Sequence, residues 1–334
     1  MASYGGRGET TNIDMRQRDW VWFLIFGLLL MTGLFFYFVF GRSGEPQIGA
    51  TFSTIYSEKL GLDLREVFLA ALDDLKIKKF RIPVYWSEIE PEQGKFVWDD
   101  LDFIVAEAGK RDAELTLVIG RKVPRWPECF IPDWAEGLEY NQAEAAVLKM
   151  EREVVNRYKE SPAVVAWQVE NEPFFPFGVC PAPNKDFFSK EVDLVKSLDK
   201  RPIMITVSGE MDPWILSAIP ADILGISMYR MSWNQALGFF PYPLSPAFYR
   251  LRALASGIFA KVTVSELQAE PWFTKPIEEL TASERAEAFT VEDLVENLEF
   301  ASDAGFSEVY LWGIEWWYVE KLAGRPELWK AGKQ

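Results

Sequence analysis

The chain has 334 residues, a formal net charge of −15 at pH 7 and no histidine. The negative charge argues against a nucleic-acid partner, because phosphates favour a basic surface. The lack of histidine excludes Ser-His-Asp triads, Cys-His dyads and His-ligated zinc. Acid–base chemistry must therefore come from carboxylates, Tyr, Lys or Cys. No Asp/Glu group has metal-ligand spacing, and we expect no cofactor.

The N-terminal region predicts a membrane anchor. Residues 1–19 are polar and glycine-rich, which is typical of a disordered tail. Residues 20–40 carry no charge and are long enough to cross a bilayer as a helix. No small-residue cleavage site follows, which favours a single-pass anchor over a signal peptide. Arg7, Arg16 and Arg18 precede this run and only Arg42 closely follows it, which predicts a cytoplasmic tail and an extracytoplasmic large domain.

Residues 41–46 are interpreted as a linker, and we predict one catalytic domain over residues 47–334. This domain alternates apolar strand-like runs with segments of helical periodicity. The predicted strands are residues 48–52, 79–85, 115–119, 164–169, 202–207, 223–228, 262–265 and 309–312. The predicted helices are residues 62–75, 98–111, 142–158, 187–198, 214–218, 246–259 and 291–304.

Eight strand–helix alternations in about 290 residues predict a (β/α)8 TIM barrel. An open doubly wound sheet is the alternative, but it usually has fewer strands and a glycine-rich phosphate loop after the first, which is absent here. In a barrel, the loops after the carboxyl ends of the strands form the active face. Residues at those ends are therefore the candidates for function.

A carboxylate, Glu172, follows the fourth predicted strand in the stretch WQVENEP (residues 167–173). Pro173 cannot donate to a strand ladder and favours an extended backbone at Glu172, which we therefore place at the strand end facing a cleft. Capping of the next helix is the alternative role. A second acid, Glu266, ends the seventh strand. Glycoside hydrolysis needs such a pair, one acid to protonate the leaving oxygen and one to attack the anomeric carbon.

Two further acids compete with this pair. Strand alternation predicts that Glu170 lies on the same side as Glu172, behind it, and Glu270 lies beyond the seventh strand. Several tryptophans near strand ends or in loops also suggest a carbohydrate cleft, although core packing is the alternative for each. These are Trp86, Trp126, Trp134, Trp272, Trp312, Trp316 and Trp317.

Three more stretches occur near strand ends: FRIPV (residues 80–84), YWSEIEPEQG (85–94) and ISMY (226–229). With the two glutamates, they resemble glycoside hydrolase clan A, the retaining (β/α)8 glycosidases, with families 5 and 42 as nearer relatives. The resemblance covers most of residues 47–318. It implies that Glu172 is the general acid/base, that Glu266 is the nucleophile and that Asn171 contacts the sugar 2-hydroxyl.

The resemblance also implies substrate-binding roles for four other residues. Arg81 is similar to an arginine that supports the nucleophile, and Tyr229 to a tyrosine that hydrogen-bonds it. Trp312 resembles a tryptophan under the sugar, and Trp86 belongs to a W-S-x-x-E-P-x-x-G stretch of several clan members. From the residues alone, Arg81 could be a buried ion-pair partner and Tyr229 a core aromatic. Trp312 is favoured as a cleft residue because a predicted loop carrying Trp316 and Trp317 follows it.

The chain departs from family 5 in lacking the histidines after strands three and six. Arg121, Lys122 and Arg125 instead form a basic group after strand three, which favours an acidic sugar or sulfate; a solvated loop with ordinary salt bridges is the alternative. Cys129 and Cys180 lie in two loops predicted on one face, where a disulfide and two free thiols are both compatible with the sequence.

Together these features predict a membrane-anchored retaining β-glycosidase that acts on a β-linked oligo- or polysaccharide. Two alternatives stay open at this point. One is a transglycosylase, in which a second sugar intercepts the covalent intermediate. The other is a non-catalytic glycan-binding or cell-envelope scaffold on the same barrel.

Overall fold

The computed structural model describes residues 20, 22–33, 45–234, 238–258, 260–273 and 279–333. The chain forms two compact units, residues 1–42 and residues 43–334. In the first unit, residues 20 and 22–33 are helical. Among the described residues, no helix is both long enough and apolar enough to cross a bilayer. The predicted tail (1–19) and residues 21 and 34–40 of the predicted anchor lie outside the described residues.

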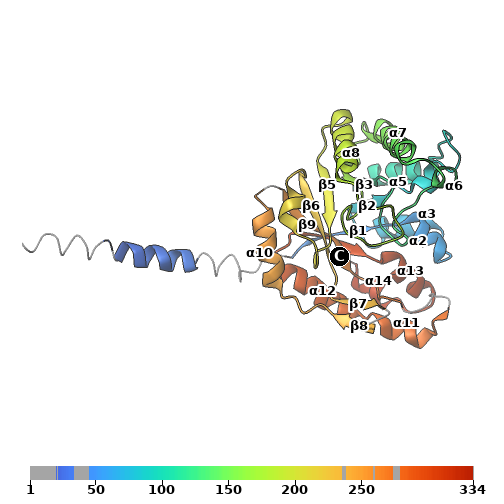
Figure 1. Cartoon of the computed structure of the whole chain (residues 1–334). Helices are drawn as coiled ribbons and strands as arrows, with labels where there is room; N and C mark the ends of the chain where they lie inside the picture. The colour runs from blue at the N-terminus through green and yellow to red at the C-terminus, as the bar shows by residue number, and fades with distance from the viewer. Residues whose placement is uncertain are drawn as a thin grey trace, which may run out of the picture. The chain divides into compact units, whose positions relative to one another are not determined.

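The second unit contains a closed barrel of parallel strands in the order β1-β10-β9-β6-β5-β4-β3-β2 (Figure 1). This confirms the predicted (β/α)8 barrel, because each of the eight barrel strands overlaps one of the predicted strands. They are β1 Gln47–Thr51, β2 Lys79–Pro83, β3 Glu114–Ile119, β4 Val164–Val169, β5 Ile203–Val207, β6 Ile223–Met228, β9 Lys261–Gln268 and β10 Glu308–Trp312.

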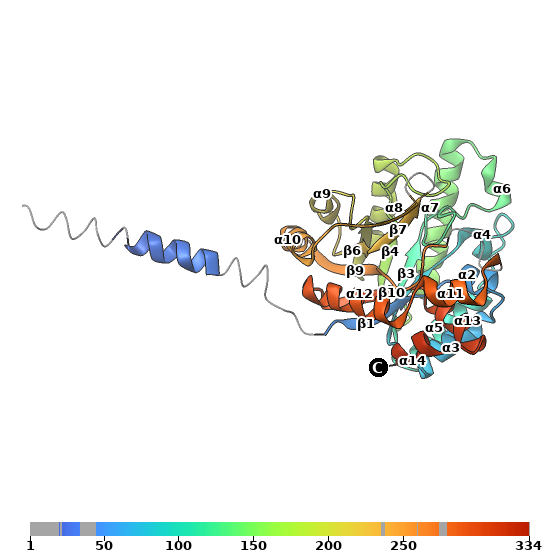
Figure 2. The ribbon, with the colours of Figure 1, turned by 90° about the horizontal axis from the view of Figure 1, so that it is seen from below.

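Helices surround the barrel, and a short antiparallel hairpin of β7 (Met231–Asn234) and β8 (Gly238–Pro241) follows β6. Figure 2 shows α3, α5, α13 and α14 grouped on one side. The described helices are α2 Thr54–Lys59, α3 Leu64–Asp73, α4 Trp86–Ile89, α5 Asp99–Gly109, α6 Asp133–Glu136, α7 Tyr140–Tyr158, α8 Lys185–Leu198, α9 Trp214–Ala218, α10 Pro246–Ser256, α11 Ala282–Ala288, α12 Val291–Asp303, α13 Ile314–Leu322 and α14 Glu327–Ala331.

Local sequence signals explain where the larger helices begin. Asp63 accepts the backbone N–H of Arg65 at the start of α3, Asn184 caps α8, and Thr290 forms a capping box at the start of α12. Such side chains satisfy the N–H groups that have no partner inside the helix. The barrel strands read as apolar runs because helices cover their outer faces, and every residue of β5 is buried.

The segment after β10 differs from its prediction as a loop. Trp316 and Trp317 lie in α13, and both side chains are 0% exposed. The indole of Trp317 donates to the carbonyl of Ala269 at 2.7 Å, and Trp316 packs edge-on against Phe273. Both rings therefore belong to the packing between α13 and the segment after β9, and neither faces a cleft. The sequence did not reveal this helix because Glu315, Glu320 and Lys321 are spread around it among the apolar residues, so that no single apolar stripe forms.

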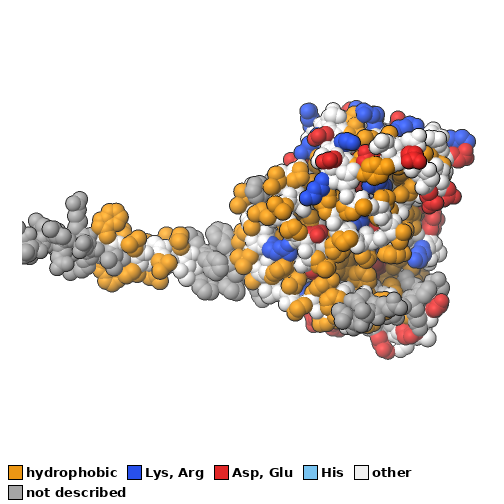
Figure 3. All heavy atoms as spheres, viewed as in Figure 1, with side chains coloured by type: hydrophobic (Ala, Val, Ile, Leu, Met, Phe, Trp, Pro, Cys, Tyr) orange, Lys and Arg blue, Asp and Glu red, His pale blue; other side chains and the backbone are white. Residues whose placement is uncertain are grey.

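The surface carries mixed charges despite the negative total. Acidic and basic side chains are interspersed with hydrophobic ones on the face shown in Figure 3. Two sets of ion pairs connect neighbouring elements. In one, Lys79 and Lys261 both contact Glu308, at 2.7 and 3.0 Å. In the other, Arg157 pairs with Asp102, so that α7 is joined to α5.

Candidate active site

A buried arginine connects several strands inside the barrel near their carboxyl ends. Arg81, on β2, is 0% exposed. Its Nη1 donates to Oε1 of Glu266 on β9 at 2.9 Å, and its Nε donates to Oε1 of Gln168 on β4 at 2.7 Å. Its Nη2 donates to Oδ1 of Asn171 at 2.6 Å. The planar guanidinium can serve these acceptors at once because its donors point in fixed directions.

The second oxygen of Glu266 is also held. Tyr229, directly after β6, donates its hydroxyl hydrogen to Oε2 of Glu266 at 3.1 Å. Burial raises the pKa of Tyr229 well above its ordinary value, and the nearby charges of Glu266 and Glu172 raise it further. The phenol therefore remains a donor. With Arg81 on one oxygen and Tyr229 on the other, the carboxylate of Glu266 has a fixed orientation.

The backbone at Glu172 is not extended, contrary to the expectation from Pro173. Strand β4 ends at Val169, and both Glu170 (φ 57°) and Glu172 (φ 41°) adopt left-handed backbone conformations. Two contacts hold this turn: the N–H of Glu172 donates to Oγ1 of Thr206 at 2.9 Å, and Nζ of Lys122 donates to the carbonyl of Glu172 at 2.9 Å. Tertiary contacts thus outweigh the local preference set by proline.

The same turn changes the place of Glu170. Strand β4 ends at Val169, so the alternation of side chains along a strand does not apply to Glu170 and Glu172. The prediction that Glu170 lies behind Glu172 on the same side was therefore wrong in its premise. The carboxylate of Glu170 instead accepts the backbone N–H groups of Arg121 at 3.1 Å and Lys122 at 2.8 Å. Glu170 therefore anchors the segment after β3 to the segment after β4.

Glu172 and Glu266 lie at the same end of the barrel and influence each other electrostatically. Burial raises the pKa of Glu172 well above its ordinary value. The charges of Glu266 and Glu128 raise it further, whereas Lys122 opposes the shift. This environment favours the protonated form of Glu172, the form that a general acid needs. Two carboxyls with different surroundings thus face one site.

Asn171 is fixed by contacts on both sides of its amide. Oδ1 accepts from Arg81 and from Oγ1 of Thr206, the latter at 3.1 Å, while Nδ2 donates to Oε2 of Glu128 at 3.0 Å. Because the oxygen faces donors and the nitrogen faces an acceptor, this amide has one favoured orientation. It is placed beside the two carboxyls, between Arg81 and Glu128.

Glu128 is a site residue that the sequence did not reveal. Its side chain comes from the loop between β3 and α6 and is 5% exposed. Burial raises its pKa to about 8, with a further contribution from the charge of Glu266. Gly178 makes room for it: a Cβ there would lie 2.6 Å from Cβ of Glu128, and its φ of 91° also favours glycine. No motif marks Glu128, and the neighbouring Cys129 is its one signal.

The structure places Cys129 and Cys180 in a disulfide, with their Cα atoms 5.3 Å apart. The disulfide joins the loop after β3 to the loop after β4. Cys129 also forms an antiparallel bridge with Lys122. Glu128 therefore sits in a loop that is attached at both ends to the segments around Glu172.

The predicted basic group does not act as one cluster. Nζ of Lys122 donates to the carbonyls of Glu172 and Phe175, so it is used internally. Arg125 pairs with Glu270 and, at 3.4 Å, with Glu315. Even with Arg125 beside it, burial raises the pKa of Glu270. Glu270 is thus the partner of Arg125 rather than of Arg81. Arg121 lines a pocket that includes neither Glu172 nor Glu266.

The predicted aromatic residues divide into two groups. Trp312 lies at the end of β10 and is partly exposed, with the guanidinium of Arg125 4.3 Å from its ring centre. Trp126, in the loop that also carries Arg125 and Glu128, is 61% exposed. Trp86 is 1% exposed and donates to Glu90 at 2.8 Å. No contact in the described residues brings Trp86 to Glu172 or Glu266.

Within the described part of the chain, no group of three or more Cys, Asp or Glu side chains has an arrangement that could hold a metal ion. The side chains that meet at this end of the barrel are carboxyls, a phenol and a guanidinium. A fixed carboxylate beside a protonated carboxyl can support acid-assisted nucleophilic displacement.

Comparison with solved structures identifies similar barrels at low sequence identity. The exo-β-1,4-mannosidase Op5Man5 from Opitutaceae bacterium strain TAV5 matches with a TM-score of 0.55 and 14% identity, over 81% of this chain and 52% of its own. The GH5_18 protein from Streptomyces cattleya matches with a TM-score of 0.54 and 14% identity, over 80% and 70%. A GH10 endoxylanase from a sugarcane soil metagenome matches with a TM-score of 0.55 and 15% identity, over 80% of this chain and 86% of its own. These matches concern the fold.

Sequence comparison adds a more specific relationship. The β-galactosidase BbgII of Bifidobacterium bifidum is 32% identical over 104 residues, which are 26% of this chain and 15% of that protein. The chain thus spans a small part of this relative and about half of the mannosidase. The model of the cellulase family, glycosyl hydrolase family 5, matches residues 43–237, more than half of the chain. The chain therefore belongs to glycosyl hydrolase family 5, a family of O-glycosyl hydrolases.

Proposed function

We propose that this protein is a membrane-anchored retaining β-glycosidase in which Glu266 is the nucleophile and Glu172 the general acid/base. One observation carries the proposal. The carboxylate of Glu266 is held by Arg81 at 2.9 Å and Tyr229 at 3.1 Å, while burial and the charge of Glu266 favour the protonated form of Glu172 at the same end of the barrel. Retaining hydrolysis needs these two states together.

In the first step, a carboxylate oxygen of Glu266 attacks the anomeric carbon. The bond from that carbon to the leaving oxygen breaks, and its electron pair takes the proton of Glu172. The products are a glycosyl ester on Glu266, an alcohol and an ionised Glu172. Esterification removes the negative charge of Glu266, and this lowers the electrostatic cost of ionising Glu172.

In the second step, ionised Glu172 takes a proton from water as the water oxygen attacks the anomeric carbon. The ester bond breaks, and its electron pair returns to Glu266 as a carboxylate. Two displacements at one carbon restore the original configuration. Arg81 and Tyr229 stabilise the carboxylate both before the first step and as it leaves in the second.

The proposed substrate is a β-linked oligo- or polysaccharide. The names of the similar proteins support this class, since they describe an exo-β-1,4-mannosidase, a β-galactosidase and an endoxylanase. Trp126 and Trp312 would supply aromatic faces for sugar rings. The amide of Asn171, oriented by Arg81 and Glu128, would contact a sugar hydroxyl.

The test is the stereochemistry of hydrolysis by the full chain. Aryl β-glycosides of several sugars should be screened, and the first product anomer followed by NMR. We expect the β-anomer to appear first, and a 2-deoxy-2-fluoro aryl glycoside to leave a sugar ester on Glu266 that peptide mass spectrometry locates. First appearance of the α-anomer, or an ester on another residue, would reject the assignment.

The proposed anchor is residues 20–40, with the barrel on the extracytoplasmic side. Its support is the uncharged run itself, the basic residues before it and the disulfide between Cys129 and Cys180, which fits an oxidising compartment. The full chain should stay with membranes after alkaline carbonate extraction, and deletion of residues 20–40 should release it. Protease added outside an intact plasma membrane should digest the barrel as it does in lysed cells; protection of the barrel that lysis abolishes would contradict this orientation.

A further inference from the structure

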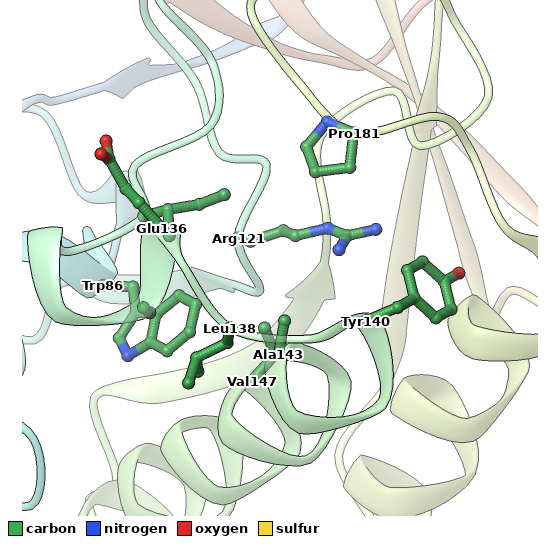
Figure 4. A pocket seen from close by; sticks show the side chains of 10 residues that line it. Trp86, Arg121, Glu136, Leu138, Tyr140, Ala143, Val147 and Pro181 are labelled. Carbon is green, nitrogen blue, oxygen red and sulfur yellow. The ribbon is translucent and has the colours of Figure 1, made fainter.

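A hollow away from the candidate active site is lined by neither Glu172 nor Glu266. It has a volume of about 250 Å³ and lies between α4, α6, α7 and the segment after Cys180 (Figure 4). Most of its walls are apolar, from Ile131, Ala135, Leu138, Ala143, Val147 and Pro181. Trp86, whose predicted sugar contact the structure does not place at the carboxyls, lines this pocket instead.

One cationic side chain enters the pocket. Arg121 is 8% exposed, and Figure 4 shows its guanidinium reaching into the hollow with Pro181 on one side and Tyr140 on the other. Among the described residues, this guanidinium has neither a hydrogen bond nor an ion pair; the ring of Phe187 lies 5.3 Å from Cζ, and the carboxyls of Glu170 and Glu191 interact with Arg121 only through space. A cationic side chain that is mostly buried keeps few contacts with water, so a ligand that supplies a charged acceptor is favoured there.

The neighbouring acids do not neutralise Arg121 by contact. The carboxylate of Glu170 accepts the backbone N–H groups of Arg121 and Lys122, and neither Glu170 nor Glu191 forms an ion pair with the guanidinium in the described residues. Burial raises the pKa of Glu191 well above its ordinary value, which favours its uncharged form. Glu136 also lines the pocket but is exposed. The positive charge therefore faces the hollow.

The shape of the pocket selects the rest of the ligand. A lone inorganic anion would leave the apolar walls in contact with water, and a neutral sugar would find few partners for its hydroxyls. A carboxylate head matches the fork of a guanidinium, and a ring or short branched chain matches the walls. From this combination we infer that the pocket is a binding site for a small organic carboxylate, with its head on Arg121 and its apolar body against Leu138, Ala143 and Val147.

This site is separate from the glycosidase chemistry, so its test does not depend on that activity. Binding of benzoate to the full chain is measured by isothermal titration calorimetry, with benzamide as the neutral analogue and inorganic phosphate as a head-group probe. We expect benzoate to bind with a Kd below about 1 mM, and benzamide and phosphate to bind at least about tenfold more weakly.

Two variants with different physical effects locate the site. Arg121→Gln removes the charge, and Ala143→Phe fills the hollow and leaves the charge in place. Both should weaken benzoate binding at least about tenfold. Arg152→Gln is the matched control, because Arg152 is exposed on α7 and does not line the pocket; it should bind benzoate like the parent. Thermal unfolding of each variant establishes that it is folded.

Three results would overturn the inference. The first is no benzoate binding by the parent chain at millimolar concentration. The second is unchanged binding in Ala143→Phe, which keeps the proposal testable even if Arg121→Gln does not fold. The third is equal binding of benzoate and benzamide, which would assign the pocket to uncharged aromatic compounds.

Discussion

Arg81 and Glu266 form an ion pair in the barrel interior, with Nη1 and Oε1 2.9 Å apart and side chains that are 0% and 7% exposed. The pair connects β2 to β9, which are separated by 185 positions in the chain. A buried pair of this kind is a weak source of net stability, because desolvation offsets most of the attraction. Its value lies in orienting the carboxylate, which is what a nucleophile requires.

Replacement of Glu266 by Ala should abolish turnover. Without the carboxylate no glycosyl ester forms, and kcat on an activated aryl β-glycoside should fall by about 10⁴-fold or more. The measurement is initial rates at saturating substrate. Glu270→Gln is the comparison, because Glu270 pairs with Arg125 rather than Arg81. Activity of Glu266→Ala within tenfold of the parent would remove Glu266 from the mechanism.

Replacement of Glu172 by Ala should slow substrates according to their leaving groups. Substrates with poor leaving groups need the proton of Glu172, whereas activated aryl glycosides need it mainly for the second step. Added azide should restore the rate on activated substrates and give a β-glycosyl azide. In the parent, the rate of the first step should fall as pH rises through the raised pKa of Glu172. Loss of this basic limb in Glu172→Ala is expected; its persistence would point to another acid.

Replacement of Arg81 by Met should reduce both stability and activity. It removes the guanidinium donors from Oε1 of Glu266 and Oε1 of Gln168 inside the barrel and leaves Oδ1 of Asn171 with Thr206 alone. Removing one member of a buried pair typically costs about 3–5 kcal/mol of unfolding free energy. Urea unfolding monitored by tryptophan fluorescence measures this cost. A loss below about 1 kcal/mol would mean that water readily replaces the guanidinium.

Replacement of Glu128 by Gln should flatten the pH dependence of stability. The pKa of Glu128 is about 8 in the folded state against an ordinary value of 4.5. Between pH 4.5 and pH 8, Glu128 is protonated in the folded chain and ionised in the unfolded chain. The stability that this proton contributes is therefore complete below pH 4.5 and is lost as pH rises through 8. The fall in unfolding free energy between pH 6 and pH 9 should be about 3 kcal/mol smaller in Glu128→Gln. An equal dependence of unfolding free energy on pH in the parent and in Glu128→Gln would contradict a protonated Glu128 in the folded chain.

Replacement of Trp126 by Ala should weaken substrate binding without slowing the chemistry. The ring is exposed in the loop between Arg125 and Glu128, where it offers a flat face to a sugar. An aromatic contact of about 1 kcal/mol corresponds to roughly a fivefold rise in KM with little change in kcat. Leu216→Ala, an exposed apolar residue on α9, serves as the control. A change in kcat alone would place Trp126 outside substrate binding.

The barrel could be predicted from the sequence because its signals are local. Each barrel strand is a short apolar run, and seven of the described helices follow amphipathic segments with helical spacing. The segments that prediction missed are of another kind. Helix α13 mixes apolar and charged residues around its circumference, so Trp316 and Trp317 gave no periodic signal. The turn at Glu172 depends on Thr206 and Lys122, which lie far away in the chain.

The sequence by itself determined the barrel and the position of Glu172 and Glu266 at the ends of strands four and seven, because hydrophobic periodicity and parallel topology place strand ends on one face. The family resemblance of the sequence already implied Arg81 and Tyr229 as partners of Glu266. Only the tertiary structure decided the other surroundings: Thr206 and Lys122 at the turn of Glu172, Glu128 behind Asn171, and Arg121 directed into a separate pocket. The physical reason is that strand periodicity extends over neighbouring residues, whereas burial, charge and hydrogen bonding at a site come from side chains brought together by eight separate strands and their loops.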